Sequence, residues 1–137
     1  MAGYSKTPLA QKLGIKAGMR LVVLSAPVKY ENLTQPLPAG IRLSSRLSVE
    51  ARFVHLFTRS RSELERRFPV LAKKLADDGI LWISWPKQAS GVQTDLNEGV
   101  VRRTGLQSGL VDVKVCAVDD TWSGLKFVRR LRDRAAR

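Results

Sequence analysis

The sequence predicts an α/β domain with a mostly parallel sheet. Three short segments at 19–25, 53–58 and 80–85 are almost wholly apolar, and segments with helical patterning separate them. This alternation is typical of buried parallel strands joined by helices, which right-handed crossovers place on both faces of the sheet. Two further strand-like segments, 110–118 and 122–128, lie too close in the chain for a helical crossover. They are therefore expected to form a C-terminal hairpin that adds an antiparallel edge.

The first element is a short helix, expected over residues 5–14. Thr7 is placed to cap it, and Pro8 suits its first turn because the missing N–H of proline is not needed there. Gly14 can adopt the left-handed conformation that ends a helix. The chain then turns into the first strand.

The strand at 19–25 is apolar on both faces, as a buried parallel strand should be, and it stops before a proline. The pattern between 27 and 47 is weak, because three prolines interrupt it. We expect only a helical turn at 30–33 and a short strand at 41–44 in this part of the chain.

After the strand at 53–58, Ser62 is placed to cap a long helix. Its apolar face is formed by Leu64, Phe68, Leu71 and Leu75. Gly79 is expected to end this helix, and Pro69 to kink or split it.

The strand at 80–85 ends at Pro86, and a helix is expected to start after Thr94, with Thr94 as its cap and acidic residues in its first turn. Gly105 should weaken this helix and Gly109 should end it.

Charge is the strongest compositional signal. The chain has a formal net charge of +12, from 24 basic and 12 acidic residues, and 15 of the basic residues are arginine. Such a charge attracts polyanions, and arginine grips phosphate in a forked geometry. The basic residues are densest near the end, which predicts a domain over 1–130 and a basic tail over 131–137. Contacts with nucleic acid or an acidic protein are expected from Arg129, Arg130, Arg132 and Arg134, unless the tail is simply a solvated segment.

The single cysteine, Cys116, excludes an internal disulfide and a thiolate metal cluster, and its apolar strand predicts an inert buried thiol. The first residues lack the apolar core of a signal peptide, and no apolar segment approaches the length of a membrane span. These features predict a cytoplasmic protein without membrane contact.

The order of elements resembles a small version of the methyltransferase-type Rossmann fold. The best local likeness is 75–86, which is similar to the helix–turn–strand that follows the cofactor site in that family. Over nearly its full length the chain more closely resembles an uncharacterised bacterial family of short proteins (a domain of unknown function). That resemblance rests on residues 5–9, 84–91, 94–96, 113–119 and 120–127. It implies a Rossmann-like fold, and no known activity comes with it.

Two features depart from the methyltransferase pattern. That family holds S-adenosylmethionine (SAM) with a glycine-rich loop after its first strand and an acidic residue at the end of its second strand. Here 24–30 contains no glycine, and 44–46 reads Ser-Ser-Arg where the acidic residue would stand. The sequence therefore leaves the cofactor undetermined.

Ligands of open parallel sheets bind outside the carboxyl ends of the strands, so the polar residues at those ends form the predicted ligand site. They are Ser25, Tyr30, Arg59, Arg61, Trp85, Lys87, Ser90, Asp119 and Trp122, with Gly91, Asp120 and Ser123 beside them. Arg59 and Lys87 are the preferred anion contacts and Trp85 is the expected wall. The alternative is that these are ordinary loop residues, which gather at strand ends in any α/β domain.

The sequence gives no catalytic constellation. His55, the only histidine, lies within an apolar strand, where a buried and hydrogen-bonded imidazole is expected. The pair Asp119–Asp120 sits in the hairpin turn, where aspartate is favoured on structural grounds. No phosphate-binding loop, paired metal-ligand histidines or nucleophile elbow is present, and no metal site is predicted.

Three functions remain open on these grounds. The first is a non-catalytic binding domain that acts through its basic surface. The second is an enzyme or sensor that binds a nucleotide-like or phosphorylated compound at the strand ends. The third is an interaction protein whose apolar sheet edge pairs with a second copy or another chain.

Overall fold

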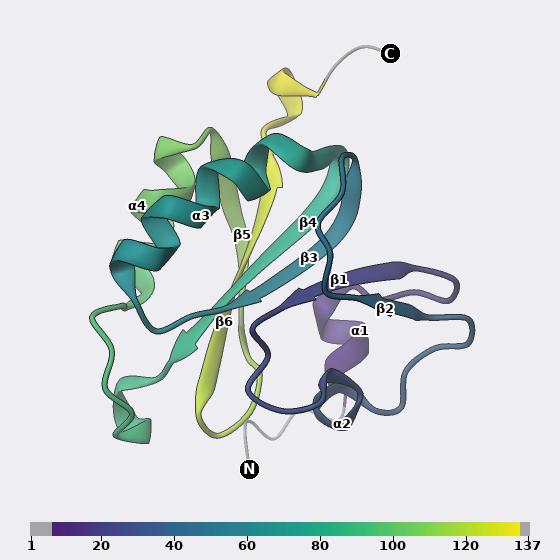
Figure 1. Ribbon diagram of the computed structural model, residues 1–137, viewed down its shortest axis with the longest axis horizontal. Coiled ribbons are helices and arrows are strands. Elements are labelled where there is room, and N and C mark those ends of the chain that lie inside the picture. Colours follow the sequence, from purple (N-terminus) through teal and green to yellow (C-terminus); the bar gives the residue numbers. More distant parts are fainter. Residues whose placement is uncertain (1–6, 135–137) are drawn as a thin grey trace.

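The computed structural model describes residues 7–134, which form a six-stranded sheet with helices on both faces (Figure 1). The strands are β1 (Arg20–Leu24), β2 (Arg42–Ser44), β3 (Ala51–Phe57), β4 (Leu75–Pro86), β5 (Leu110–Ala117) and β6 (Trp122–Arg129). The α-helices are α1 (Leu9–Leu13), α2 (Tyr30–Thr34), α3 (Arg61–Lys74) and α4 (Glu98–Gln107), with 3-10 turns at Gln88–Ser90 and Leu131–Asp133. Within the described range, no helix combines the length and the apolar character that a membrane crossing requires.

The strand order is β2-β1-β3-β4-β6-β5, and β1 to β4 are parallel. Strand β6 is antiparallel to both β4 and β5, so β5 runs in the same direction as β4. The predicted α/β fold and hairpin are confirmed, but the antiparallel strand is not at the edge. The crossover through α4 leaves one strand position empty beside β4, and β6 returns to fill it. The exposed edge is β5, where a register shift between Asp112 and Lys114 interrupts the ladder.

Two apolar layers cover the sheet. On one face α3 and α4 pack on the sheet, and Phe68 and Phe127 meet edge to face with ring centroids 5.2 Å apart. On the other face α1 and α2 cover a layer that includes Phe53 and Trp82. The indole Nε1 of Trp82, which is fully buried, donates to the carbonyl oxygen of Leu13 at 2.8 Å.

The long helix differs from its predicted limits at both ends. Ser60, not Ser62, is the N-cap of α3, and its Oγ accepts from the backbone N–H of Glu63 at 3.2 Å. The helix is unbroken across Pro69, whose ring is exposed, and it ends at Lys74 rather than at Gly79. Leu75 already belongs to β4, because it pairs with the start of β3 before the ladder shifts register.

The shorter helices are also displaced. Helix α1 begins at Leu9 with Pro8 as its N-cap, and Gly14 ends it in the left-handed region as predicted. Helix α4 is capped by Asn97, whose Oδ1 accepts from the N–H of Val100 at 2.9 Å. The predicted cap, Thr94, lies three residues before Asn97, and its hydroxyl instead donates to the backbone carbonyl of Arg59.

Residues 45–50, here called the strap, connect β2 to β3 without a helix. Because β2 and β3 lie on either side of β1, the strap crosses β1, and Leu47 packs on the same apolar layer as α3. Arg20 fastens it to the sheet: its Nη1 donates to Ser48 Oγ at 2.8 Å, and its Nη2 donates to Ser44 Oγ at 3.0 Å. The sequence pattern did not indicate this crossing.

Candidate functional site

The residues predicted as a ligand site separate into three groups at the carboxyl ends of the strands. The first surrounds Arg59, which is exposed and lines a hollow of about 400 Å³ with Ser60, Thr94 and Asp95. The hydroxyl of Thr94 donates to the Arg59 carbonyl at 2.7 Å, and Asp95 Oδ1 accepts from the Arg61 N–H at 2.7 Å. The N-terminus of α3, which would attract an anion, therefore already holds a carboxylate.

The second group lies where β4 and the hairpin meet, and its polar atoms stabilise the loops themselves. The N–H of Lys87 donates to the Thr121 carbonyl at 2.7 Å, and Ser90 Oγ donates to the Lys87 carbonyl at 2.6 Å. Asp119 Oδ1 accepts from the backbone N–H groups of Thr121 at 2.9 Å and Trp122 at 2.7 Å. Asp119 thus closes the hairpin turn, which is the structural role that aspartate commonly takes in turns.

The third group lies at the end of β1 and in the core. Ser25 is exposed, has a φ of 60°, and its Oγ accepts from Arg67 Nη1 at 3.4 Å. Tyr30 and Trp85 are buried, with only 4% and 5% of their surfaces exposed, so little of either ring could touch a ligand. The hollow beside Arg59 is lined by none of the residues of the second and third groups.

A buried hydrogen-bonded chain runs through the centre of the sheet. His55 is fully buried; its Nδ1 lies 2.8 Å from the Tyr30 hydroxyl and its Nε2 lies 2.7 Å from Ser84 Oγ. Burial lowers the pKa of His55 to about 3 and raises the pKa of Tyr30. The imidazole is therefore neutral at neutral pH, and the chain is structural, as the sequence predicts for His55.

This burial predicts a pH-dependent stability. His55 takes up a proton near pH 6.5 in the unfolded chain but only near pH 3 in the folded chain. The stability that the neutral, buried His55 contributes is therefore complete above about pH 6.5 and is lost as the pH falls below that value. From about pH 6.5 to about pH 5 the free energy of unfolding should fall by roughly 2 kcal/mol. Urea denaturation at several pH values measures this. His55→Gln should flatten the dependence, and an equally steep fall in that variant would contradict the assignment.

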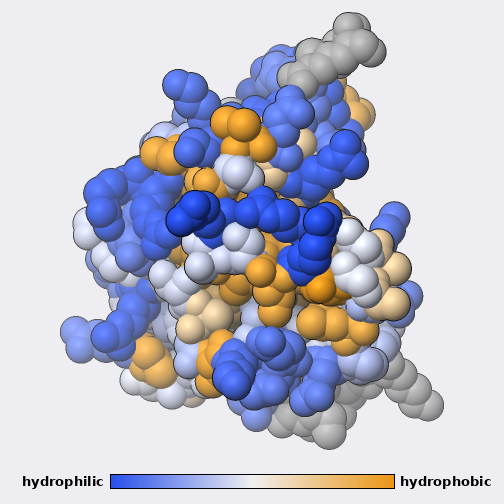
Figure 2. All heavy atoms as spheres, turned by 45° about the vertical axis from the view of Figure 1, so that its right-hand side comes forward, coloured by the Kyte–Doolittle hydropathy of each residue, from blue (hydrophilic) through white to orange (hydrophobic). Residues whose placement is uncertain are grey.

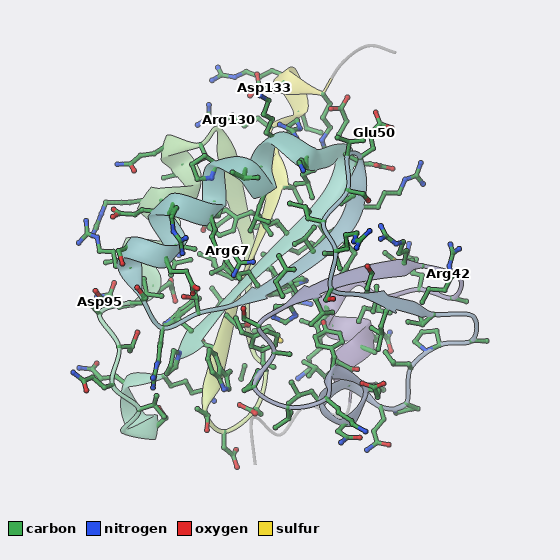
Figure 3. All side chains as sticks on the ribbon, in the orientation of Figure 1. Arg42, Glu50, Arg67, Asp95, Arg130 and Asp133 are labelled. Atoms are coloured by element: carbon green, nitrogen blue, oxygen red, sulfur yellow. The ribbon has the colours of Figure 1, made fainter. Side chains whose placement is uncertain are left out.

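A large hollow lies at the opposite edge of the sheet, where β1 to β4 begin. It has a volume of about 730 Å³, and we call it the basic basin. Its charged lining residues are Lys16, Arg20, Arg42, Arg52, Glu50 and Asp78. Figure 3 shows Arg42 and Glu50 on this side of the molecule and Asp95 on the other. In Figure 2 this side shows a band of strongly hydrophilic side chains above hydrophobic ones.

The cations of the basic basin are not neutralised within residues 7–134. No hydrogen bond or ion pair holds the guanidinium groups of Arg42 and Arg52 there, and Arg20 donates only to neutral oxygens. The four cations come from three segments of the chain, and each lies just before or near the start of a strand: Lys16 and Arg20 at β1, Arg42 at β2 and Arg52 at β3. Sequence reasoning missed them because it examined only the carboxyl ends, although the shared position at strand starts was readable.

The predicted basic tail is partly built into the fold. Arg129 is the last residue of β6; its Nη2 donates to the carbonyls of Ala72 at 2.8 Å and Leu75 at 2.6 Å, and its Nε lies 3.6 Å from Asp77 Oδ1. The Arg129 guanidinium therefore stabilises the junction between the end of α3 and the start of β4. Arg134 Nε donates to the Arg129 carbonyl at 3.1 Å.

The remaining predicted tail contacts are less constrained. Arg130 is half-buried, and Arg132 is exposed with its Nε 3.9 Å from Asp133 Oδ1. Residues 135–137 lie outside the described range. Among residues 7–134, no group of three histidine, cysteine, aspartate or glutamate side chains is arranged to hold a metal ion.

Comparison with known proteins bears on the fold. No protein-family model and no curated protein matches the sequence. Among solved structures, magnesium protoporphyrin IX methyltransferase from Synechocystis PCC 6803 with bound SAM has a TM-score of 0.55 and 12% identity, over 89% of this chain and 74% of that one. A structure from Thermoplasma acidophilum described as a methyltransferase has a TM-score of 0.57 and 8% identity, over 96% and 77%. The fold is that of the SAM-dependent methyltransferases.

Other structures with this methyltransferase-like fold agree. A type 11 methyltransferase structure from Sulfolobus solfataricus has a TM-score of 0.54 and 12% identity, over 91% of each chain. The complex of LepI with SAM has a TM-score of 0.54, and this chain covers 47% of the LepI chain. At such low identities the likeness describes the fold alone. The predicted methyltransferase-like Rossmann core is thereby confirmed.

Proposed function

We propose that this chain is a non-catalytic binding domain that holds the phosphate backbone of a nucleic acid in the basic basin. The observation that carries the proposal is the convergence of Lys16, Arg20, Arg42 and Arg52 around one large hollow. Two carboxylates also line it, so the basin keeps an excess of positive charge. Arginine and lysine on an open surface contact phosphates and release counterions, which favours binding without reading the bases.

The strap contributes to this surface by fixing one of the cations. The hydrogen bonds from Arg20 to the strap hold its guanidinium plane in place before a ligand arrives. A positioned guanidinium loses less side-chain entropy when it binds a phosphate than a free one does. Arg42 and Arg52 remain available on either side, at the starts of β2 and β3.

Support for a non-catalytic role comes from the carboxyl ends of the strands. Asp119 is committed to the hairpin turn and Tyr30 to His55. The imidazole of His55 is buried and far below its ordinary pKa, so it is a poor acid or base at neutral pH. These three groups are thus held by contacts within the fold.

The test measures binding of a short fluorescein-labelled DNA duplex by anisotropy at several salt concentrations between about 50 and 200 mM. The double variant Arg42→Gln/Arg52→Gln should weaken binding and lower the slope of log K against log salt by about 2, because each lost phosphate contact removes about one unit. Arg103→Gln is the control, since Arg103 is exposed on α4 and lies outside the basin.

Two results would contradict the proposal. One is an unchanged slope in the double variant, which would place the contacts elsewhere. The other is a loss in the Arg103 variant of half the size seen in the double variant, which is the same loss for each charge removed and would show that only the net charge matters. Circular dichroism of each variant checks that the fold is retained.

A second candidate function, binding of SAM at the carboxyl ends, is favoured by the fold of the neighbours. A ligand present at about one hundred times its dissociation constant adds about 2.7 kcal/mol to the free energy of unfolding, which raises the melting temperature measurably. We expect no shift with SAM or S-adenosylhomocysteine, because no glycine follows β1 and Ser25 occupies the turn. A clear shift would instead support the second candidate.

A further inference from the structure

A second hollow lies on the other side of the strap, between the strap and α3. It has a volume of about 390 Å³, within the range of small-molecule sites. Its apolar walls are Leu24, Leu47, Val70 and Leu71, and its charged groups are Arg66 and Arg67. We call it the strap pocket. None of its charged residues lines the basic basin, so it is a separate feature.

The strap pocket lies where the topology favours a ligand. Strand β1 has β2 on one side and β3 on the other, so the chain reverses its direction of travel across the sheet at β1. Ligands of open α/β sheets bind at this switch point, outside the carboxyl ends of the strands. Leu24, the last residue of β1, forms part of the pocket wall.

The chemistry of the lining specifies the ligand. Leu24 and Leu71 are buried beneath the pocket, so the apolar surface that a ligand could touch comes from Leu47, which is half-buried, and from Val70, half of whose surface is exposed at the mouth. Arg66 is exposed and its guanidinium makes no hydrogen bond or ion pair within residues 7–134. An apolar surface beside a free guanidinium fits a molecule with an apolar body and one anionic head.

Arg67 supplies a second, partly committed cation. Its Nη1 lies 3.8 Å from Glu63 Oε2 and 3.4 Å from Ser25 Oγ, and 29% of its side chain is exposed. One long ion pair and one long hydrogen bond leave several of its five N–H donors open. The two arginines can therefore accept one carboxylate between them while the walls exclude water from an alkyl chain.

We propose that the strap pocket binds a small amphipathic monoanion, such as a medium-chain carboxylate, with the alkyl chain on Leu47 and Val70 and the carboxylate on Arg66. This goes beyond the proposed nucleic-acid function and does not depend on it. A phosphate backbone has no alkyl chain to cover this apolar surface.

Isothermal titration of the full chain with decanoate, below its micelle concentration, tests the proposal. Decanoate should bind one to one, and decanol should bind at least about tenfold more weakly because it lacks the charge. Arg66→Gln should weaken decanoate binding about tenfold. Val70→Glu should weaken it by at least as much, since it places a like charge at the mouth.

Matched controls separate this site from general effects. Arg103→Gln removes a charge from another helix, and Val113→Glu makes the same change at a valine of similar exposure on β5. Both controls, and Arg42→Gln/Arg52→Gln, should bind decanoate as the unaltered chain does. The proposal is overturned if decanoate fails to bind, if decanol binds equally well, or if the controls lose as much affinity as Arg66→Gln and Val70→Glu.

Discussion

Replacing Gly105 with alanine is expected to lower the free energy of unfolding by about 2 kcal/mol or more, although alanine is the better helix former. A Cβ atom at this position would lie 2.1 Å from Cε1 of Phe127. Phe127 is fully buried on β6 and packs against Phe68, so its ring has no free direction in which to move. The added methyl group must therefore push α4 away from the sheet.

Gly99→Ala is the matched control, because Gly99 lies in the same helix. A Cβ there would meet its nearest atom at 3.4 Å, which is ordinary contact, so the variant should gain up to about 1 kcal/mol from helix propensity. Urea denaturation of both variants measures the two effects. If both variants were stabilised, the close packing of α4 on Phe127 would be wrong.

Replacing Arg129 with methionine is expected to lower the free energy of unfolding by about 3 kcal/mol. Methionine keeps most of the apolar packing of the stem but removes both donors to the carbonyls of Ala72 and Leu75, together with the ion pair to Asp77. The Ala72 carbonyl lies in the last turn of α3, where it also accepts from the N–H of Leu75, and the Leu75 carbonyl belongs to the first residue of β4.

Arg132→Met is the control, since 76% of the Arg132 side chain is exposed and the change should stay within about 0.5 kcal/mol. Thermal or urea denaturation compares the pair. Equal small losses would show that Arg129 is only a surface charge. A truncation that tests the basic tail should accordingly leave Arg129 in place and remove residues after it.

Gly105 and Arg129 show which structural roles could not be predicted from the sequence. Gly105 was read as a weak point in a helix, because propensity is all that a single segment reveals. Its purpose depends on Phe127, which lies on a strand more than twenty residues later. Arg129 was assigned to a solvated or partner-binding tail because its neighbours are basic. Its partners are main-chain atoms at the end of α3, and no side-chain pattern marks those.

The candidate sites divide in the same way. The sequence placed polar residues at the carboxyl ends of the strands, and the structure confirms that location for Arg59 and Lys87. It could not show that Asp119 accepts hydrogen bonds from backbone N–H groups of the hairpin turn, or that Tyr30 forms a hydrogen bond with His55. The basic basin and the strap pocket both depend on the strap crossing β1. The six residues of the strap have neither helical nor strand periodicity, so the sequence could not predict this crossing.

The sequence alone determined the α/β class, the three buried parallel strands, the hairpin and the buried, hydrogen-bonded state of His55. These follow from local apolar periodicity and from connections too short for a crossover, both of which a single segment records. Only the tertiary structure decided where β6 inserts, where α3 ends, and which cations converge. Those outcomes depend on contacts between segments distant in the chain, since strand order and charge clustering are set when the sheet assembles and not by any one stretch of residues.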